Sequence, residues 1–259
     1  MALMDEFREE RDKIKNAPLK TKIGYIVDYY KWPIIGVVAA VIIITSFIYN
    51  QVTKKEDALN GMLINTTRYG STYSVEQYES LYFDILQTLN LDPKEYQIEL
   101  NTSVSLSLSG NSSVSYYDSQ SLTVLMTRVG AETIDFLTGN ISTMQNLAYR
   151  GYLEDLTNLL SEEDYLKYEP YFLYIDNAII KELQENTSFS DDETLIEYPD
   201  CDKPETMKEP IPVMIDMSEC KVLPEIYNHP EDEALVFGIT INAPHVENTT
   251  LFLEYLMKQ

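Results

Sequence analysis

The chain has 259 residues and a formal net charge of −23, and 44% of its residues are hydrophobic, a share typical of a folded protein. The charge lies almost entirely after residue 50, where 12 Lys or Arg stand against 36 Asp or Glu, a net of −24. Such a surface repels nucleic-acid phosphates and anionic lipid headgroups, so nucleic acid is not an expected partner. The charge serves solubility or, as the alternative, attracts cations or a basic partner.

Residues 1–31 form a charged but nearly neutral tail, with seven Lys or Arg and six Asp or Glu. Apolar residues recur at helical spacing towards its end, at Leu19, Ile23, Ile26, Val27 and Tyr30. This spacing predicts an amphipathic helix that lies on a membrane surface before the chain turns in at Pro33. The alternative is a plain helical extension of the segment that follows.

Residues 32–49 are predicted to form one transmembrane helix. Residues 33–49 read PIIGVVAAVIIITSFIY and contain no charge. Together with Trp32 they span roughly 27 Å as a helix, close to the ~30 Å of a bilayer core. Aromatic residues flank the segment, as is typical of membrane interfaces: Tyr29, Tyr30, Trp32 and Tyr49. The lipid bilayer is therefore an expected partner.

The positive charges around this helix predict its orientation. Five Lys precede it, whereas Lys54 and Lys55 alone follow closely, so the positive-inside rule keeps the N-terminus in the cytoplasm. Residues 47–50 read FIYN, which offers no small-residue cleavage site, so the segment is interpreted as an uncleaved signal anchor. We expect a single-pass cell-membrane protein with an extracellular C-terminal domain. The uncleaved anchor and the scarcity of Cys favour a bacterium of the Gram-positive type.

After a polar linker at residues 50–57, strand and helix patterns alternate through residues 58–259. Ser74 and Gln77 form a capping-box pattern that begins a helix, and Ser161 is the expected N-cap of another. The Ser-rich stretch 101–117, in which apolar residues alternate, predicts an extended strand or hairpin. The other expected strands are residues 58–65, 96–100, 133–137, 212–217 and 234–242, and the expected helices are residues 75–89, 119–129, 141–150, 162–168 and 246–257.

This alternation predicts one three-layer α/β domain with a mainly parallel sheet. In open α/β sheets, ligands bind beyond the carboxyl ends of the strands, which here means the loops after the first and third strands. Tyr and Arg are good anchors for sugars or peptides, and ordinary loop residues are the alternative. The candidate ligand-binding residues are Arg68, Tyr69, Gly70, Ser71, Thr138, Gly139 and Asn140.

The two cysteines, Cys201 and Cys220, both fall in the expected extracellular domain. An oxidising compartment permits a disulfide between them, but spacing alone does not fix the geometry that one needs. The oxidised pair and two free thiols therefore both stay open. Their separation from the two His argues against a zinc site.

Catalytic and metal-binding motifs are missing from the sequence. It has no Gly-x-Ser-x-Gly, no His-Glu-x-x-His and no phosphate-binding glycine loop. His229 falls in a loop pattern, and His245 precedes the last helix, where we expect it to cap or pack. Residues 191–193 and 231–233 are consecutive acids, which do not supply the alternate oxygens of a calcium loop. We therefore predict no enzyme, no cofactor and no metal.

Several short stretches of the domain follow a shared pattern. Asp135-Phe136-Leu137 is followed by a helix and then by GYLEDLT at residues 151–157, and later come PIPV at 210–213, FGITINA at 237–243 and FLEYL at 252–256. These stretches resemble extracellular solute-binding proteins of ABC transporters, the periplasmic-binding-protein type II-like class. The first two are similar to the first lobe of that family, PIPV to its returning strand, and the last two to its late strand and closing helix.

The resemblance implies a reduced, membrane-anchored relative with one lobe, because the stretch where a second lobe would lie, residues 185–210, is short. The function it implies is a membrane-tethered extracytoplasmic binding module for a small molecule or peptide. The alternative is an assembly or interaction subunit that docks another membrane protein without a small ligand.

Overall fold

The computed structural model describes residues 18–68, 74–108, 115–185, 198–229 and 234–258. The chain divides into two compact units, Met1–Lys54 and Lys55–Gln259. The second unit, called the acidic domain below, holds the sheet and both hydrophobic cores.

The first unit contains one long helix, α2 (Leu19–Thr53), which continues through Pro33. Its part Lys31–Thr53 has a mean hydropathy of 2.2 and is long and apolar enough to cross a membrane or to act as a signal sequence. Every side chain at residues 31–49 is exposed. One helix thus covers the apolar segment and the end of the tail, as in the alternative of a helical extension.

The predicted linker at residues 50–57 is wrong at both ends. Helix α2 continues to Thr53, and strand β1 begins at Glu56, so only Lys54 and Lys55 separate the two elements. The polar side chains after Tyr49 suggested a loop, but polar residues are compatible with the last turn of an exposed helix.

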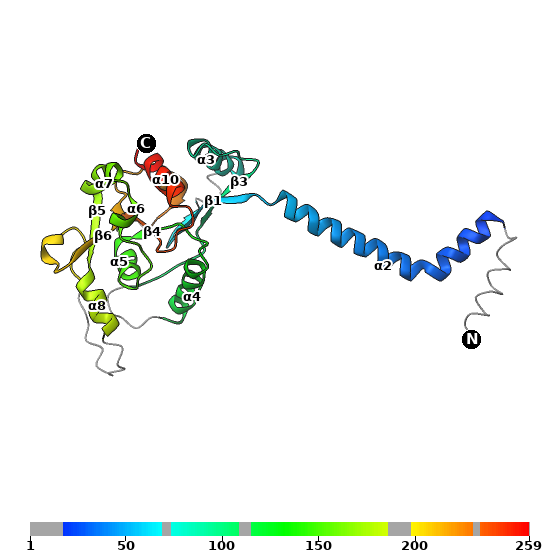
Figure 1. Ribbon diagram of the computed structural model, residues 1–259, viewed down its shortest axis with the longest axis horizontal. Coiled ribbons are helices and arrows are strands. Elements are labelled where there is room, and N and C mark those ends of the chain that lie inside the picture. Colours follow the sequence, from blue (N-terminus) through cyan, green and yellow to red (C-terminus); the bar gives the residue numbers. More distant parts are fainter. Residues whose placement is uncertain (1–17, 69–73, 109–114, 186–197, 230–233, 259) are drawn as a thin grey trace. The chain divides into compact units, whose positions relative to one another are not determined.

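The acidic domain is an α/β structure in which helices cover both faces of a six-stranded sheet (Figure 1). The strand order is β3-β1-β4-β8-β6-β5. The strands are β1 (Glu56–Leu63), β3 (Tyr96–Asn101), β4 (Phe136–Asn140), β5 (Phe172–Asp176), β6 (Pro210–Asp216) and β8 (Leu235–Ile239). A separate two-stranded ribbon pairs β2 (Thr67–Arg68) with β7 (Tyr227–Asn228).

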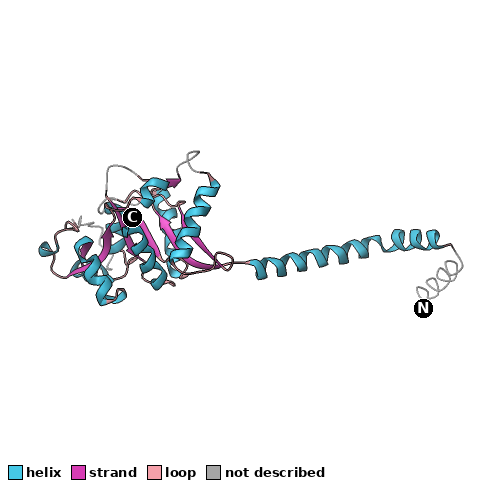
Figure 2. Cartoon of the chain, turned by 90° about the horizontal axis from the view of Figure 1, so that it is seen from above, coloured by secondary structure: helices cyan, strands magenta, loops and turns pink. Residues whose placement is uncertain are grey.

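Figure 2 shows the helices of the acidic domain packed around its strands. The longer ones are α3 (Val75–Thr88), α4 (Tyr116–Gly130), α5 (Ile141–Tyr149), α8 (Asn177–Glu185) and α10 (Val246–Lys258). The shorter ones are α6 (Leu156–Leu159), α7 (Glu162–Tyr168), α9 (Val222–Ile226), and the 3-10 turns η1 (Glu169–Tyr171) and η2 (Pro204–Thr206).

Four of the six strands run in one direction, as the prediction of a mainly parallel sheet requires. Strand β1 pairs in parallel with β3 and β4, whereas β8 is antiparallel to both β4 and β6, and β5 is antiparallel to β6. The reversed strands β8 and β5 make three of the five pairings antiparallel. The sequence did not predict this, because a strand buried on both faces has the same continuous apolar pattern in either direction.

Two hydrophobic cores fill the two faces of the sheet. Alternate residues of β1 divide between them: Leu63 belongs to the core beneath α3 and α10, and Met62 to the core beneath α4 and α5. Phe136 centres the first core, where it stacks on Phe237 at 4.8 Å between ring centroids. This is the three-layer arrangement that alternating strands and helices predict.

The predicted helix starts are confirmed where a cap is visible in the sequence. Ser74 and Gln77 form the capping box of α3, and Ser161 caps α7. Helix α4 begins three residues before its predicted start, because Ser115 is its N-cap and accepts a hydrogen bond from the backbone of Asp118.

The strand predicted within residues 101–117 is wrong for its described part. Val104, Leu106 and Leu108 are buried as the alternation indicates, but residues 102–108 lie outside the sheet. The backbone of Leu106 instead bonds the side-chain amide of Asn65, at 2.8 Å to Oδ1 and 2.6 Å from Nδ2. Alternation reports which side chains are buried, and it does not report what the backbone pairs with.

Candidate functional site

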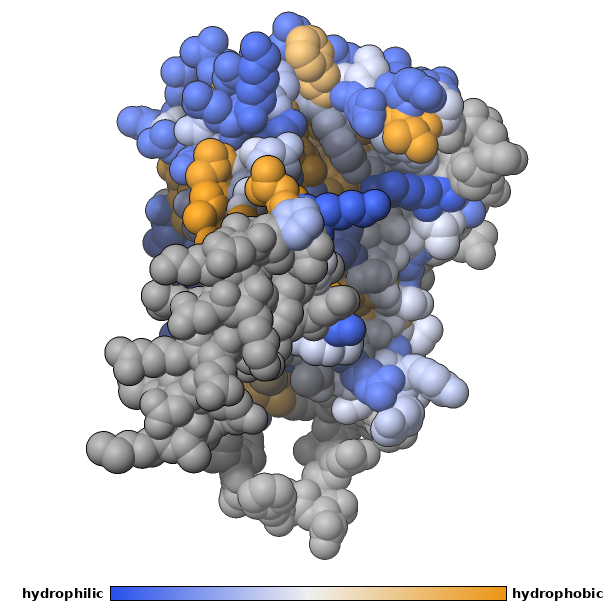
Figure 3. Space-filling view, turned by 90° about the vertical axis from the view of Figure 1, so that its right-hand side faces the viewer, coloured by the Kyte–Doolittle hydropathy of each residue, from blue (hydrophilic) through white to orange (hydrophobic). Residues whose placement is uncertain are grey.

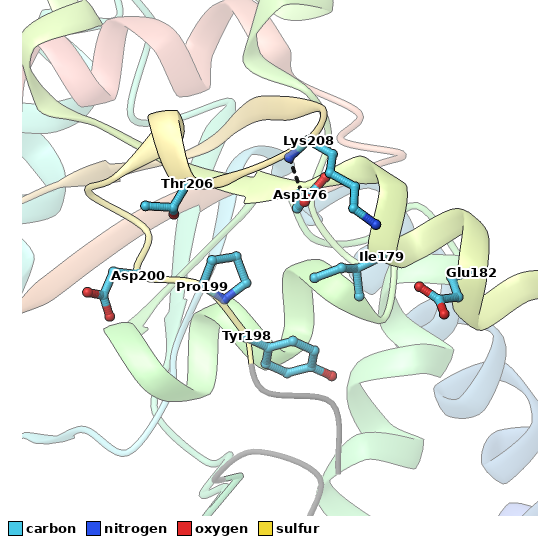
Figure 4. A pocket seen from close by; sticks show the side chains of 8 residues that line it. All are labelled: Asp176, Ile179, Glu182, Tyr198, Pro199, Asp200, Thr206 and Lys208. Atoms are coloured by element: carbon cyan, nitrogen blue, oxygen red, sulfur yellow. Dashed lines mark hydrogen bonds between the residues drawn. The ribbon is translucent and has the colours of Figure 1, made fainter. Parts of the chain in front are cut away.

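A shallow pocket of about 480 Å³ lies beside the end of β5 in the acidic domain. Its walls come from the end of β5, from α8, and from the chain between residues 198 and 208 (Figure 4). The lining residues are Asp176, Ile179, Glu182, Tyr198, Pro199, Asp200, Thr206 and Lys208.

Asp176 forms a fixed polar floor. Its carboxylate accepts backbone N–H bonds from Ala178 (3.0 Å), Lys208 (2.8 Å) and Glu209 (2.9 Å). Burial acts to raise the pKa of Asp176, but these backbone hydrogen bonds outweigh it and hold the pKa below its usual range. The carboxylate is thus ionised and committed to joining the end of β5 to the start of β6.

An aromatic pair forms one side of the pocket. The ring of Tyr198 stacks on Tyr149 at 4.0 Å between centroids and 14° between planes. Tyr149 is itself held in place, since its hydroxyl accepts the backbone N–H of Asp176 at 3.1 Å. Burial raises the pKa of Tyr149 to about 12, so this wall is uncharged at neutral pH. A ligand would meet a rigid aromatic surface here.

The charges at the rim differ in what they contact. Asp200 pairs with Lys203 and Glu209 pairs with Lys181. The ammonium of Lys208 forms no hydrogen bond or ion pair with the residues that the structure describes, and in Figure 4 its side chain extends beside Ile179. Lys208 is therefore the cation that this pocket offers to a ligand.

The pocket has the chemistry of non-covalent binding. Among its lining residues, the hydroxyl of Thr206 donates to the backbone of Lys203 and the carboxylate of Asp176 is fully bonded. Within the described ranges, no three His, Cys, Asp or Glu gather as metal ligands would. The pocket can hold a ligand by one ammonium, one aromatic face and a few polar atoms.

The residues predicted from the sequence lie at the opposite end of the strands. Asn140 ends β4 opposite Leu235, whereas Asp176 ends β5 opposite Pro210, the first residue of β6. Since β4 and β6 run in the same direction, the two ends are opposite edges of the sheet. The sequence predicts no strand at residues 172–176, and β5 is also reversed, so its carboxyl end lies away from those of β1 and β4.

The predicted residues that the structure describes differ in their surroundings. Thr138 is fully buried, and its Oγ1 has no hydrogen-bond partner among the described residues. A Cβ on Gly139 would lie 3.3 Å from Ile64. Asn140 is the N-cap of α5, where its Oδ1 accepts the backbone N–H of Thr143 at 3.3 Å. Arg68, on the β2–β7 ribbon, holds its guanidinium 4.9 Å from the ring centre of Tyr78.

The other three predicted residues, Tyr69, Gly70 and Ser71, lie outside the described residues. A ligand site at this edge of the sheet stays a prediction.

His229 occupies the same edge as Arg68, with its imidazole partly buried. Its Nδ1 lies 2.9 Å from the hydroxyl of Thr66, which itself donates to the carbonyl of Ile64 at 3.1 Å. With that hydroxyl as the donor to Ile64, Nδ1 carries the proton, and the buried Nε2 is an acceptor without a partner among the described residues. Burial lowers the pKa of His229 to about 4. The ring is a neutral internal group.

His245 packs as the sequence predicts. Its backbone N–H donates to the fully buried carboxylate of Asp135 at 2.7 Å, and its Nδ1 lies 3.2 Å from the same carboxylate. The contact fixes the start of α10 beside the residue that precedes β4. This is a structural role for both side chains.

Cys201 and Cys220 are free thiols in the structure, and each is buried in a different core. The sheet separates the two cores, so the disulfide that the sequence left open is not formed. Burial raises the pKa of Cys201 to about 12 and also raises the pKa of Cys220. Neither thiol is a ready nucleophile.

Comparison with known proteins gives distant similarities. No family model matches the chain, and no curated protein matches it. One similar structure is the ABC substrate-binding protein Lmo0181 from Listeria monocytogenes in complex with cycloalternan, with 12% identity and a TM-score of 0.24 over 56% of this chain. This chain covers 35% of that protein's length.

A second similar structure is the PBP AgtB from A. tumefaciens R10 in complex with agropinic acid. It has 10% identity and a TM-score of 0.30, over 76% of this chain and 77% of that one. Both neighbours are solute-binding proteins, and the likeness of this chain to them is a remote one.

Proposed function

We propose that this protein is a membrane-tethered extracytoplasmic binding module, not an enzyme, and that the pocket beside β5 takes its ligand. The observation that carries the proposal is the pocket itself, which combines a fixed floor at Asp176, an aromatic wall at Tyr198 and the ammonium of Lys208, which forms no ion pair within the described residues. Its volume of about 480 Å³ falls within the roughly 300–1,000 Å³ of small-molecule sites.

The tether is helix α2. Apolar side chains are exposed throughout its central part, for example Ile42 at 62% and Ile43 at 68%. Water is an unfavourable environment for such a continuous apolar surface, whereas a bilayer core is a favourable one. The excess of Lys before the apolar segment supports a cytoplasmic N-terminus, which places the acidic domain outside.

The charges around the pocket indicate the class of ligand. Lys208 would pair with one carboxylate, and Tyr198 offers a face to a flat or apolar body. Glu182 at the rim would repel a second negative charge and would favour an amine. The best fit is a small zwitterion or monocarboxylate, such as an amino acid or a short peptide.

The test is a thermal-shift screen of the full chain in detergent against amino acids, short peptides and neutral sugars. A ligand at 100 times its dissociation constant stabilises the folded state by about 2.7 kcal/mol, so Tm rises measurably. We expect a response to a zwitterion or monocarboxylate that is lost in Lys208→Gln and weakened in Tyr198→Leu.

Lys221→Gln is the matched control, because Lys221 is an exposed lysine outside the pocket. It should keep the full response. A response that survives Lys208→Gln would place the ligand elsewhere, and a folded chain that responds to none of the three classes would contradict the proposed ligand.

A second candidate is an assembly subunit that docks another membrane protein. The observation that favours it is the outer surface of α4, whose exposed side chains carry no charge although the domain is strongly acidic. In that case a second protein should co-purify from detergent in a fixed ratio, and the pocket variants should leave this association unchanged.

A further inference from the structure

One part of the acidic domain, within the described residues, exposes very few charges. Residues 101–127 contain a single charged residue, Asp118, in a chain where charged residues make up 24%. In the structure this stretch supplies α4 and the extended segment 102–108, which the contact between Ser107 and Asp118 holds together. The exposed residues of α4 together with those of segment 102–108 are called the α4 face.

The two charged residues within α4 are buried or paired, and the exposed Glu132 lies beyond its C-terminal end. Asp118 is 8% exposed and points inward, where its carboxylate accepts bonds from the backbone of Ser107 (2.8 Å) and the hydroxyl of Ser115. Arg128 forms an ion pair with Glu99 of β3 at 3.2 Å. The absence of charge on the α4 face is thus a property of its sequence and of the way its one acid is buried.

The α4 face also exposes large side chains. Four of the exposed large hydrophobic residues of the domain lie on this helix: Tyr116 (72%), Tyr117 (79%), Val124 (46%) and Met126 (63%). Helices α3, α7 and α10 instead carry Asp and Glu. Hydrophilic side chains are prominent on the surface seen in Figure 3, with apolar ones scattered between them. Interface cores are depleted of charge and enriched in Tyr and Met, which is the composition of α4.

We propose that the α4 face is where two copies of this chain associate. A basic partner would be attracted to the acidic surfaces and would gain nothing from α4, whereas a like-charged partner must avoid placing carboxylates opposite carboxylates. A second copy carries the same net charge of −24 after residue 50 and presents the same uncharged helix. An isologous contact of α4 with α4 lets two such domains meet without like charges face to face.

The contact is small, so its strength depends on how concentrated the copies are. A helix of 15 residues such as α4 is about 22 Å long, so the face is smaller than the ~800 Å² per partner of a stable complex. We expect weak association of dilute chains and substantial association where copies share one membrane, because confinement raises their effective concentration.

Cross-linking tests this in native membranes. Gln120→Cys and Thr123→Cys place a thiol on the exposed side of α4, while the native Cys201 and Cys220 are buried. A short bis-maleimide should give a covalent dimer of the chain with either variant. Glu79→Cys on α3, Glu163→Cys on α7 and the unsubstituted chain are controls and should give little. Equal cross-linking of all variants, or adducts with other proteins alone, would overturn the proposal.

A charge exchange tests the same contact, with cross-linking through Gln120→Cys as the readout. Thr123→Glu with Thr127→Glu places acids on both copies, and we expect cross-linking through Gln120→Cys to fall about tenfold. Ser80→Glu with Thr88→Glu adds the same charge on the exposed side of α3 and should have no effect.

Co-expression with a Thr123→Lys, Thr127→Lys copy should restore a mixed dimer, which also shows that the Glu variant is folded. Failure of the mixed pair to cross-link, while each Glu or Lys copy alone unfolds at its usual temperature, would overturn the proposed contact.

Discussion

At the scale of single residues, His229 links burial to the pH dependence of stability. Its pKa is about 4 in the folded chain against 6.5 for a free His, because burial disfavours the charged ring. The unfolded chain therefore takes up a proton at higher pH than the folded chain does. The stability that depends on this residue is complete above about pH 6.5 and is lost as the pH falls towards 4.

We expect the free energy of unfolding to fall by up to about 3 kcal/mol between pH 7 and pH 4 through His229 alone. Urea unfolding at several pH values measures it. His229→Asn keeps a donor towards Thr66 without the titration, so its stability should depend less on pH over this range. The carboxylates titrate in both chains and cancel in the difference. Parallel pH profiles of the two chains would contradict the assigned burial.

Gly61 is a second residue at which a substitution should change stability, because β1 passes against the ring of Phe136 and leaves no space for a side chain. A Cβ at position 61 would lie 2.1 Å from Cζ of Phe136, a ring that also contacts Phe237 and Phe252. Gly61→Ala should destabilise the domain by about 3 kcal/mol, near the upper end for overpacking a core. Thermal or urea unfolding measures this.

Gly130→Ala is the matched control, since nothing lies within 4 Å of its added methyl group, and its effect should be close to zero. In the double variant Gly61→Ala, Phe136→Leu, the smaller side chain makes room for the methyl group. The double variant should then lose less stability than the two single variants lose together. A loss equal to that sum would show that the clash is relieved elsewhere.

At the scale of elements, the sequence predicted the features that depend on neighbouring residues. The capping box at Ser74 and Gln77, the cap at Ser161 and the periodicity of the longer helices are local, and the structure has them. Sheet pairing depends on distant residues. Strand β8 is placed between β4 and β6, and the short apolar run LVFGI gives no sign of that position or of its direction.

The pocket was unpredictable for the same reason. Its floor needs Asp176 to meet the backbone of Lys208 and Glu209, about 30 residues later, and its wall needs Tyr198 to stack on Tyr149. No motif relates these positions in the sequence. The edge that the sequence did indicate holds Arg68 and His229, together with the buried Thr138 and with Asn140, which caps α5.

The hydrogen bond between Asp118 of α4 and Ser107 of the segment 102–108 gives a prediction at the scale of elements. Asp118 accepts bonds from Ser107 and Ser115, which hold its pKa below the usual range, so it is ionised at neutral pH. Asp118→Asn keeps the shape and removes the charge, and should cost about 1–3 kcal/mol, as for hydrogen bonds to charged groups.

Hydrogen exchange should also accelerate at Ser107 in Asp118→Asn. Asp84→Asn on the exposed side of α3 is the control and should stay within about 0.5 kcal/mol of the unsubstituted chain. Equal effects of the two substitutions would mean that the bonds to Asp118 do not stabilise α4.

At the scale of the whole molecule, the two units differ in how much apolar surface they expose. The acidic domain buries its own cores, whereas α2 exposes apolar side chains along the segment Lys31–Thr53. Charge follows the same division, with a nearly neutral tail before the helix and a net of −24 after residue 50. The proposed membrane tether would account for both contrasts, since it would give the apolar helix a lipid environment and leave the acidic surface in water.

The tether predicts a specific failure when charge enters the helix. Val38 and Ile42 lie one turn apart near the middle of the apolar segment, where each Lys costs roughly 2.5–3.5 kcal/mol on insertion scales. We expect Val38→Lys with Ile42→Lys to lose resistance to carbonate extraction and to lose exposure of the acidic domain to protease added to intact cells.

Leu166→Lys with Leu251→Lys adds the same charge at exposed apolar positions of the acidic domain and should leave both properties intact. A double-Lys helix that still resists extraction would contradict the tether. An unsubstituted chain whose acidic domain is protected in intact cells would contradict the orientation and leave the tether standing, so the two parts of the proposal fail separately.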